Sequence, residues 1–400
     1  MENELKFSVS PIKLEEAISR TGCYDMVEEN GIIWFWWFNA NGLCQFDSAT
    51  KSVDIIAQYE NAPNEKRDLY RAIKKIGNKM VLAPRAAKEI AIYDMELKEM
   101  RYLGLADVQD CRKEKYDENY KFVVSLRHRN TVYLLGYRYP AIVKIDLETS
   151  KVTYLTAWVD EIESRMKNES DMRGYLIHAI ASDEEAWIAC GNTNALLRLD
   201  FKTDEISVID IPCRMDGFGG IAWANENFWL VGRGKESNII VRWNARSAET
   251  KEIEIFSPDE CKKSDPFHPP IVLRNKIMLF PISGKHVYEI DTITERVTVC
   301  TVFDGLFDNE EINFCPHAVT GMCRTGEKIW FITGKDLLWN EYDCNTKTIS
   351  RYEVKAQIST EPLKRMIASI TDEVLRESKT NIPFGHKLSL SQFIRLLSVD

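Results

Sequence analysis

A pattern that repeats seven times along the chain limits its fold more than any other feature of the sequence. Each unit begins with an apolar run that often contains Trp, such as Ala186-Trp187-Ile188, and continues with a second apolar alternation. This second run ends in an acidic or amide residue. Successive end residues are about 49 positions apart, and a period near 50 is typical of proteins built from repeated supersecondary units. The seven end residues are Asp47, Asp94, Asp146, Asp200, Asn244, Asp291 and Asp343.

The residues after this second run indicate how the strands are connected. Five of the seven units continue as Asp-x-x-Thr, and both side chains can bond backbone N–H groups in a tight turn that closes a hairpin. A further β-rich run follows each turn, as in 151–155, and another precedes the Trp-containing run, as in 70–76. Four short strands in each of seven units predict an all-β fold, a seven-bladed β-propeller of four-stranded antiparallel blades. The alternative is a large β-sandwich with accidental periodicity, which the shared turn motif disfavours.

One unit also resembles a known family. Residues 186–203, AWIACGNTNALLRLDFKT, are similar to a blade of the streptogramin-lyase-like propellers, whose blades run W-[IF]-x…N-x-[LI]-x-R-[LI]-D-x-x-T. The likeness covers about residues 21–357 and is a likeness of the repeat. It implies the propeller fold. For the lyases of the family it also implies a His base and a divalent metal on one face of the ring.

The two ends of the chain fall outside the repeats. Residues 1–20 contain a short apolar alternation, which we interpret as an additional strand that helps to close the ring of residues 21–357. Residues 358–400 instead show apolar residues at helical spacing, with Pro362 near the start of the first helix. We expect a C-terminal helical appendage. It either packs on the flank of the propeller or serves as a docking or dimerisation element.

Composition excludes several classes of protein. The chain has 61 Asp and Glu against 52 Lys and Arg, so it lacks the positive field that nucleic-acid binding needs. It has no apolar run of 18 residues, and its first 30 residues lack the apolar centre of a secretory signal. Its ten cysteines are dispersed without a C-x-x-C pair. We therefore expect a cytosolic protein with reduced thiols, no nucleic-acid partner and no membrane insertion.

The repeat register singles out candidate site residues. The first strand of each propeller blade lines the central channel, and the residues that open these strands converge near the axis. Counting back from the Trp-containing strands places three of the six histidines at about one structural position, in the fourth, sixth and seventh units. Polar residues of the first two units share this rim. The candidate ligand-binding residues are Tyr24, Asp25, Arg71, His178, His268 and His317.

Two interpretations of these residues stay open. They either line a water-filled channel and satisfy one another, or they converge on a small anion, a metal or a polar substrate. Imidazoles are metal ligands and general bases near neutral pH, and an arginine can clamp a carboxylate. His178, His268 and His317 are therefore the candidates for catalysis and for a divalent metal cofactor. Standard motifs such as G-x-S-x-G, H-E-x-x-H and the P-loop are absent from the sequence.

The connections between units favour one face of the ring for recognition. They are long and charged, and they open on the face where the three histidines lie. We favour a binding function, in which a polar ligand, a glycan or a partner protein engages this loop-rich face. The alternatives are a metal-assisted lyase or hydrolase at the channel mouth, and a scaffold that forms oligomers through the helical tail. The connections are 59–69, 105–119, 157–173, 257–266 and 302–316.

Overall fold

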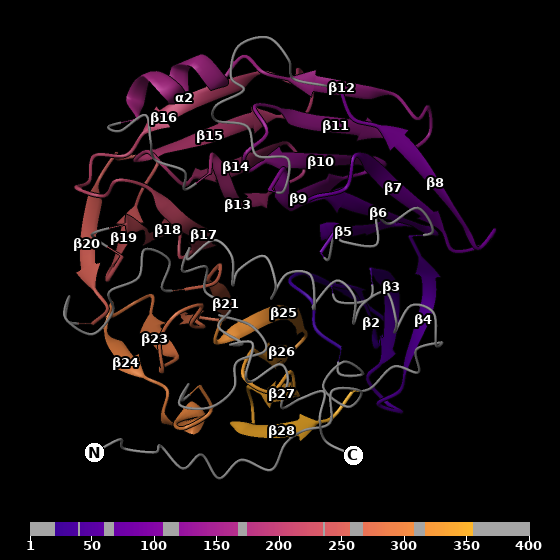
Figure 1. Ribbon diagram of the computed structural model, residues 1–400. Coiled ribbons are helices and arrows are strands. Elements are labelled where there is room, and N and C mark those ends of the chain that lie inside the picture. Colours follow the sequence, from indigo (N-terminus) through magenta and orange to yellow (C-terminus); the bar gives the residue numbers. More distant parts are fainter. Residues whose placement is uncertain are drawn as a thin grey trace, which may run out of the picture.

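A computed structural model shows a ring of seven four-stranded antiparallel sheets, which confirms the predicted seven-bladed β-propeller (Figure 1). The first strand of each blade lies toward the centre of the ring and the fourth toward its outer edge. The structure describes residues 21–38, 41–59, 68–106, 120–166, 174–234, 237–256, 267–307 and 317–354. The predicted N-terminal strand, the C-terminal helices and most of the long connections lie outside these residues.

Each blade is built from four consecutive strands of the chain. Blade 1 contains β1 (Met26–Glu29), β2 (Ile32–Trp37), β3 (Gly42–Asp47) and β4 (Val53–Gln58). Blade 2 contains β5 (Tyr70–Ile76), β6 (Lys79–Pro84), β7 (Glu89–Asp94) and β8 (Glu99–Gly104). Blade 3 contains β9 (Phe122–His128), β10 (Thr131–Gly136), β11 (Ile142–Asp146) and β12 (Val152–Leu155). Blade 4 contains β13 (Leu176–Ala181), β14 (Glu185–Cys190), β15 (Ala195–Asp200) and β16 (Ile206–Asp210).

The last three blades follow the same order. Blade 5 contains β17 (Phe218–Ala224), β18 (Asn227–Gly232), β19 (Ile239–Trp243) and β20 (Thr250–Glu254). Blade 6 contains β21 (Ile271–Leu273), β22 (Lys276–Leu279), β23 (Tyr288–Asp291) and β24 (Val297–Val299). Blade 7 contains β25 (Val319–Thr325), β26 (Lys328–Thr333), β27 (Trp339–Asp343) and β28 (Thr348–Tyr352). In the part of the chain that the structure describes, two connections carry short helices, α2 (Val159–Arg165) and the single-turn η2 (Thr301–Phe303). Among the described residues, no helix has the length and apolar character needed to cross a membrane.

The turn between the third and fourth strands is the same in all seven blades. In each one, the Asp or Asn at the end of the third strand accepts two bonds from backbone N–H groups, two and three residues later. These bonds confirm the hairpin predicted from the Asp-x-x-Thr motif. The residue four positions after the Asp or Asn is left-handed in every blade, with φ between 57° and 61°. The left-handed residues are Lys51, Lys98, Ser150, Asp204, Ala248, Glu295 and Lys347.

The hydrophobic core is divided into seven clusters, one at each junction between neighbouring blades. The aromatic run of β2 shows how one strand serves two junctions. Trp34 and Trp36 pack against blade 2, whereas Phe35 and Trp37 pack against blade 7. Successive side chains of a strand point to opposite faces, so a strand covered on both faces is apolar at every position.

The ring closes where the described chain begins and ends. The backbone N–H of Thr21 donates to the carbonyl oxygen of Val354, with an N···O distance of 3.2 Å. The indole N–H of buried Trp339 donates to the carbonyl oxygen of Thr21 at 3.1 Å. The cluster of apolar side chains between blades 1 and 7 surrounds these bonds. Contacts between neighbouring blades therefore join the two ends of the ring.

Candidate functional site

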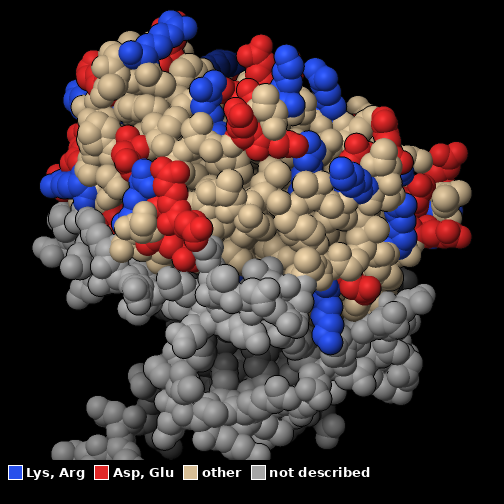
Figure 2. Space-filling view, turned by 90° about the horizontal axis from the view of Figure 1, so that it is seen from above, with Lys and Arg blue, Asp and Glu red and all other residues tan. Residues whose placement is uncertain are grey.

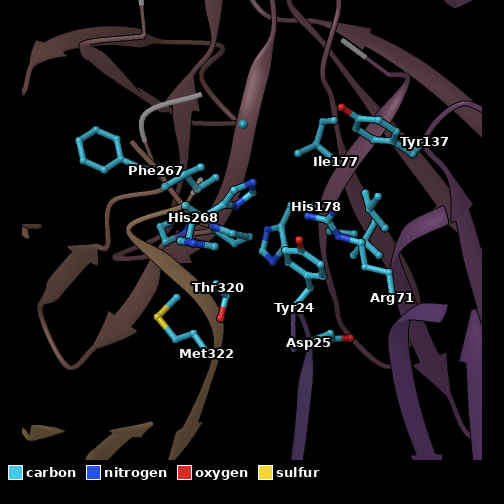
Figure 3. A pocket seen from close by; sticks show the side chains of 18 of the residues that line it. Tyr24, Asp25, Arg71, Tyr137, Ile177, His178, Phe267, His268, Thr320 and Met322 are labelled. Atoms are coloured by element: carbon cyan, nitrogen blue, oxygen red, sulfur yellow. The ribbon is translucent and has the colours of Figure 1, made fainter. Parts of the chain in front are cut away.

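A pocket of about 880 Å³ lies on the axis of the ring and is lined from all seven blades. The side chains that line it come from elements far apart in the sequence and point into the same space (Figure 3). The structure brings together all the candidate site residues that the repeat register predicted. These are Tyr24, Asp25, Arg71, His178, His268 and His317.

Irregular pairing of the first strands helps to form this pocket. In five blades the register between the first and second strands shifts near the channel mouth. Such a β-bulge bends the strand and re-aims the side chain of the extra residue. A residue from each shifted stretch lines the pocket. These residues are Arg71, Val123, Ile177, Gly219 and Thr320.

Arg71 presents a positive charge to the pocket. Its guanidinium carbon lies 4.2 Å from the centre of the Tyr24 ring, and Tyr24 in turn contacts the rings of Phe38 and His317. Among the described residues, Arg71 has no hydrogen bond or ion pair with another side chain. Stacking on an aromatic ring restrains the guanidinium plane while it leaves the N–H groups at its edge available to an acceptor.

Asp25 holds the neighbouring blade in place. One carboxylate oxygen accepts the backbone N–H of Met26 at 3.0 Å. The other accepts the backbone N–H of Ile73 at 2.9 Å and lies 3.4 Å from the ammonium group of Lys74. Because Ile73 and Lys74 belong to β5, this carboxylate ties blade 1 to blade 2 beside Arg71. The sequence predicted Asp25 as a ligand-binding residue, and the structure assigns its oxygens to backbone and lysine donors.

His178 and His268 are fixed in opposite tautomers. The Nδ1 atom of His178 accepts the backbone N–H of Ile221 at 3.3 Å, so the proton of the neutral ring lies on Nε2. The Nε2 atom of His268 lies 2.8 Å from the carbonyl oxygen of Val319, an acceptor, so this nitrogen carries the proton and Nδ1 does not. Desolvation lowers the pKa of both rings to about 4. Both histidines are therefore neutral near pH 7.

The described residues do not fit a divalent metal. A protein metal site typically needs three or more His, Cys, Asp or Glu ligands around one point. Within the described part of the chain, no three such side chains are close enough to share an ion. His178 has its Nδ1 lone pair on the Ile221 N–H and its proton on Nε2, so it has no lone pair left for a metal, and the oxygens of Asp25 are occupied as described. The three histidines line one pocket without forming a ligand set.

The structure adds pocket residues that the sequence analysis missed. Arg85, Tyr137 and Arg233 follow the second strands of blades 2, 3 and 5, and Tyr120 precedes the first strand of blade 3. The guanidinium of Arg85 lies 3.9 Å from the centre of the Tyr120 ring and forms an ion pair with Asp68. Arg85, Tyr137 and Arg233 each lie three residues after the middle of a second strand, as Arg85 lies after Leu82. Applying this spacing to every repeat could have identified them from the sequence.

The pocket is basic although the chain as a whole is acidic. The net charge of the chain is −9. Figure 2 shows acidic and basic side chains interspersed on the outside of the ring. Among the described residues that line the pocket, Asp25 is the only carboxylate. The lysines and arginines that line it are Arg71, Lys74, Arg85, Arg233 and Arg324.

Solved structures similar to this chain include several propellers. Virginiamycin B lyase from Staphylococcus aureus has a TM-score of 0.57 at 16% identity, covering 81% of this chain and 96% of that one. A catalytically inactive histidine-to-alanine variant of that lyase, with quinupristin, has a TM-score of 0.58 at 17% identity, covering 81% and 95%. The extracellular domain of a one-component system from B. thetaiotaomicron has a TM-score of 0.54 at 13% identity, covering 84% and 43%.

These similarities establish the fold. At such low identity they confirm the predicted resemblance to streptogramin-lyase-like propellers at the level of architecture, and propellers host unrelated activities. No family model matches the chain. No curated protein matches it in sequence. Function therefore has to be argued from the pocket itself.

Proposed function

We propose that this propeller is a binding protein whose channel pocket holds a small organic anion. The observation that carries the proposal is the Arg71 guanidinium, which lines the pocket without an anionic partner among the described residues. Planar guanidinium groups pair with carboxylates and phosphates through two parallel hydrogen bonds. Tyr24 fixes the guanidinium plane beforehand, which reduces the entropy lost on binding.

The surroundings of Arg71 support an anion over a neutral ligand. Lys74 lies on the same strand, and its charge is only partly balanced by Asp25 at 3.4 Å. The pocket volume of about 880 Å³ falls in the range of sites that enclose small molecules. An anion inside this pocket, where His178 and His268 are partly desolvated, also interacts more strongly with these cations than it would at the exposed surface.

The observations favour binding over metal-assisted catalysis. A metal-dependent lyase or hydrolase needs a ligand set that the described residues do not form. A general base works best with a pKa near the working pH, whereas the pKa of His178 and His268 is about 4. Docking of a partner through the predicted helical tail, or through most of the rim connections, concerns segments outside the described residues.

Calorimetric titration of the full chain tests the proposal. The probes are glucuronate, inorganic phosphate and neutral glucose, each measured in low and in moderate salt. We expect at least one anion to bind, glucose to bind more weakly, and the affinity to fall with added salt as charges are screened. If neither anion binds, or if glucose binds as well as glucuronate, the proposal is wrong.

Two arginine variants provide the matched comparison. Arg71→Met removes the pocket charge and keeps most of the apolar stem. We expect it to weaken anion binding by about 10- to 100-fold, as is typical when a charge-assisted hydrogen bond is lost. Arg198→Met removes an arginine of β15 that pairs with Glu185 of β14 and does not line the pocket, so this variant should bind like the original chain. Equal affinities for the two variants would contradict a role for Arg71.

A further inference from the structure

The two histidines offer the pocket one donor and one acceptor. Because Ile221 fixes the tautomer of His178, its Nε2–H remains as a donor. Because the carbonyl of Val319 takes the Nε2–H of His268, the Nδ1 of His268 remains as an acceptor. Neither of these remaining nitrogens has a hydrogen-bond partner among the described residues. Both side chains line the pocket beside Tyr24 and Arg71 (Figure 3).

Blades 5 and 6 pack closely beside the two histidines. The backbone N–H of Ile221 contacts His178, and the preceding residue is Gly220. A Cβ atom on Gly220 would lie 2.6 Å from Cδ of Pro270 and 3.1 Å from Cα of Pro269. These prolines directly follow His268, so the absence of a side chain at Gly220 allows the His268 segment to pack against β17, the strand whose Ile221 N–H bonds His178.

This donor and acceptor distinguish between chemical groups. A hydroxyl both donates and accepts hydrogen bonds. It can accept a hydrogen bond from His178 Nε2–H and donate one to His268 Nδ1. A carboxylate or phosphate oxygen only accepts, and it would face the lone pair of His268 Nδ1. Two cations lie beside the histidines, Arg71, whose charge also lowers the pKa of His268, and Lys74, whose charge also lowers the pKa of His178. The pocket therefore places a carboxylate-binding group next to a hydroxyl-binding pair.

We infer that the pocket selects a hydroxylated carboxylic acid, of the sugar-acid class, with its carboxylate on Arg71 and a hydroxyl between His178 and His268. This inference rests on the proposed function, since it specifies the anion that the same pocket takes. The pocket has room for a ligand of this size. The low pKa of both rings keeps the donor and acceptor unchanged across the neutral pH range.

The test compares two acids that share a six-membered ring and a carboxylate. Glucuronate carries hydroxyl groups, cyclohexanecarboxylate carries none, and inorganic phosphate controls for binding by charge alone. We expect glucuronate to bind the full chain at least tenfold more tightly than cyclohexanecarboxylate, because the latter leaves the two ring nitrogens without partners. Equal binding of the two acids overturns the inference and leaves the proposed function standing. If neither acid nor phosphate binds, or if Arg71→Met binds them unchanged, the proposed function itself is wrong.

Histidine variants can distinguish the role of the ring nitrogen that is available to a ligand from the role of the nitrogen that bonds the backbone. In His178→Asn the amide can still accept the Ile221 N–H, and in His268→Gln it can still donate to Val319, but each loses the pocket-facing nitrogen. We expect both to fold with unfolding midpoints close to the original and to reduce the preference for glucuronate at least threefold.

The converse variants keep the pocket-facing atom. His178→Gln retains an N–H donor near the position of Nε2, and His268→Asn retains an oxygen acceptor near the position of Nδ1. Each gives up the backbone bond instead, so we expect lower stability with most of the preference for glucuronate kept. The inference is overturned if His178→Asn and His268→Gln show the preference of the original chain.

Discussion

The outer turns and the channel mouth of this propeller follow opposite rules. The turn between the third and fourth strands has the same Asp or Asn bonds and the same left-handed residue in all seven blades. At the channel mouth the corresponding residues differ from blade to blade, as Arg71, Ile177 and Thr320 illustrate. Repetition therefore identifies what holds a blade together. Departure from repetition identifies what is specific to this protein.

The largest loss of folding stability is expected from a substitution in the apolar cluster between blades 1 and 7, where the ring closes. Trp339 is fully buried between blades 1 and 7, and its indole N–H bonds to Thr21. Trp339→Ala should lower the free energy of unfolding by about 3–5 kcal/mol, since it leaves a large cavity. Trp223, whose side chain is 49% exposed, is the matched control, and Trp223→Ala should cost much less. Urea unfolding measures both, and similar losses would contradict closure through this cluster.

A smaller effect should appear when the pH is lowered. The pKa of His178 and His268 is about 4 in the folded protein, against an ordinary value of 6.5. Between these values the unfolded chain takes up protons that the folded chain does not, so stability is lost as the pH falls from 6.5 toward 4. Because solvent in the channel reduces the full effect, we expect a loss on the order of 1–2 kcal/mol for each histidine.

Unfolding in urea at several pH values measures this dependence. The double variant His178→Asn, His268→Gln removes both titrating rings and should show a flatter dependence between pH 6.5 and 4. The account is contradicted if the double variant loses stability over this range as steeply as the original chain does.

Two adjacent glycines sharpen the comparison within one strand. A methyl group on Gly220 would collide with Pro270, whereas on Gly219 its nearest neighbour would be 3.8 Å away. Gly220→Ala should therefore lower stability by about 1–2 kcal/mol and weaken ligand binding by displacing the His268 segment. Gly219→Ala should be tolerated in stability. Thermal unfolding measures the stability of the two variants, and titration with glucuronate measures their affinity. Equal stability and equal affinity would refute a special role for Gly220.

The smallest effect concerns a repeated turn. Ala248 is exposed and left-handed, with φ of 57°, a conformation that costs an L residue more than glycine. Ala248→Gly should raise the free energy of unfolding by about 0.5–1 kcal/mol. Ser247→Gly, one residue earlier, relieves no positive φ and removes the hydroxyl that accepts the backbone N–H of Glu249, so it should destabilise. Equal effects of the two changes would argue against strain at position 248.

Much of the fold could be predicted because it depends on local, repeated signals. An Asp such as Asp200 bonds its own turn, and alternation in 34–37 divides the aromatic side chains between two junctions. The same register placed His178 and His268 correctly on the channel. A strand position, once known, fixes which way a side chain points within a regular sheet.

The chemistry of the site could not be predicted in the same way. The carboxylate of Asp25 accepts hydrogen bonds from Ile73 and Lys74 because blades 1 and 2 pack side by side, which the sequence does not reveal. The tautomers depend on Ile221 and Val319, which are distant in sequence from the rings they contact. That the Arg71 guanidinium would stack on the Tyr24 ring depends in the same way on the packing of blades 1 and 2. Repeat counting finds the residues that line a channel, whereas their roles follow from three-dimensional partners.

A crystal structure of the full chain with glucuronate tests the central claim most directly. The account predicts the carboxylate within hydrogen-bond distance of the Arg71 guanidinium, and a hydroxyl within hydrogen-bond distance of both His178 Nε2 and His268 Nδ1. A sugar acid bound with its carboxylate away from Arg71, or a pocket that stays empty at saturating glucuronate, would contradict it.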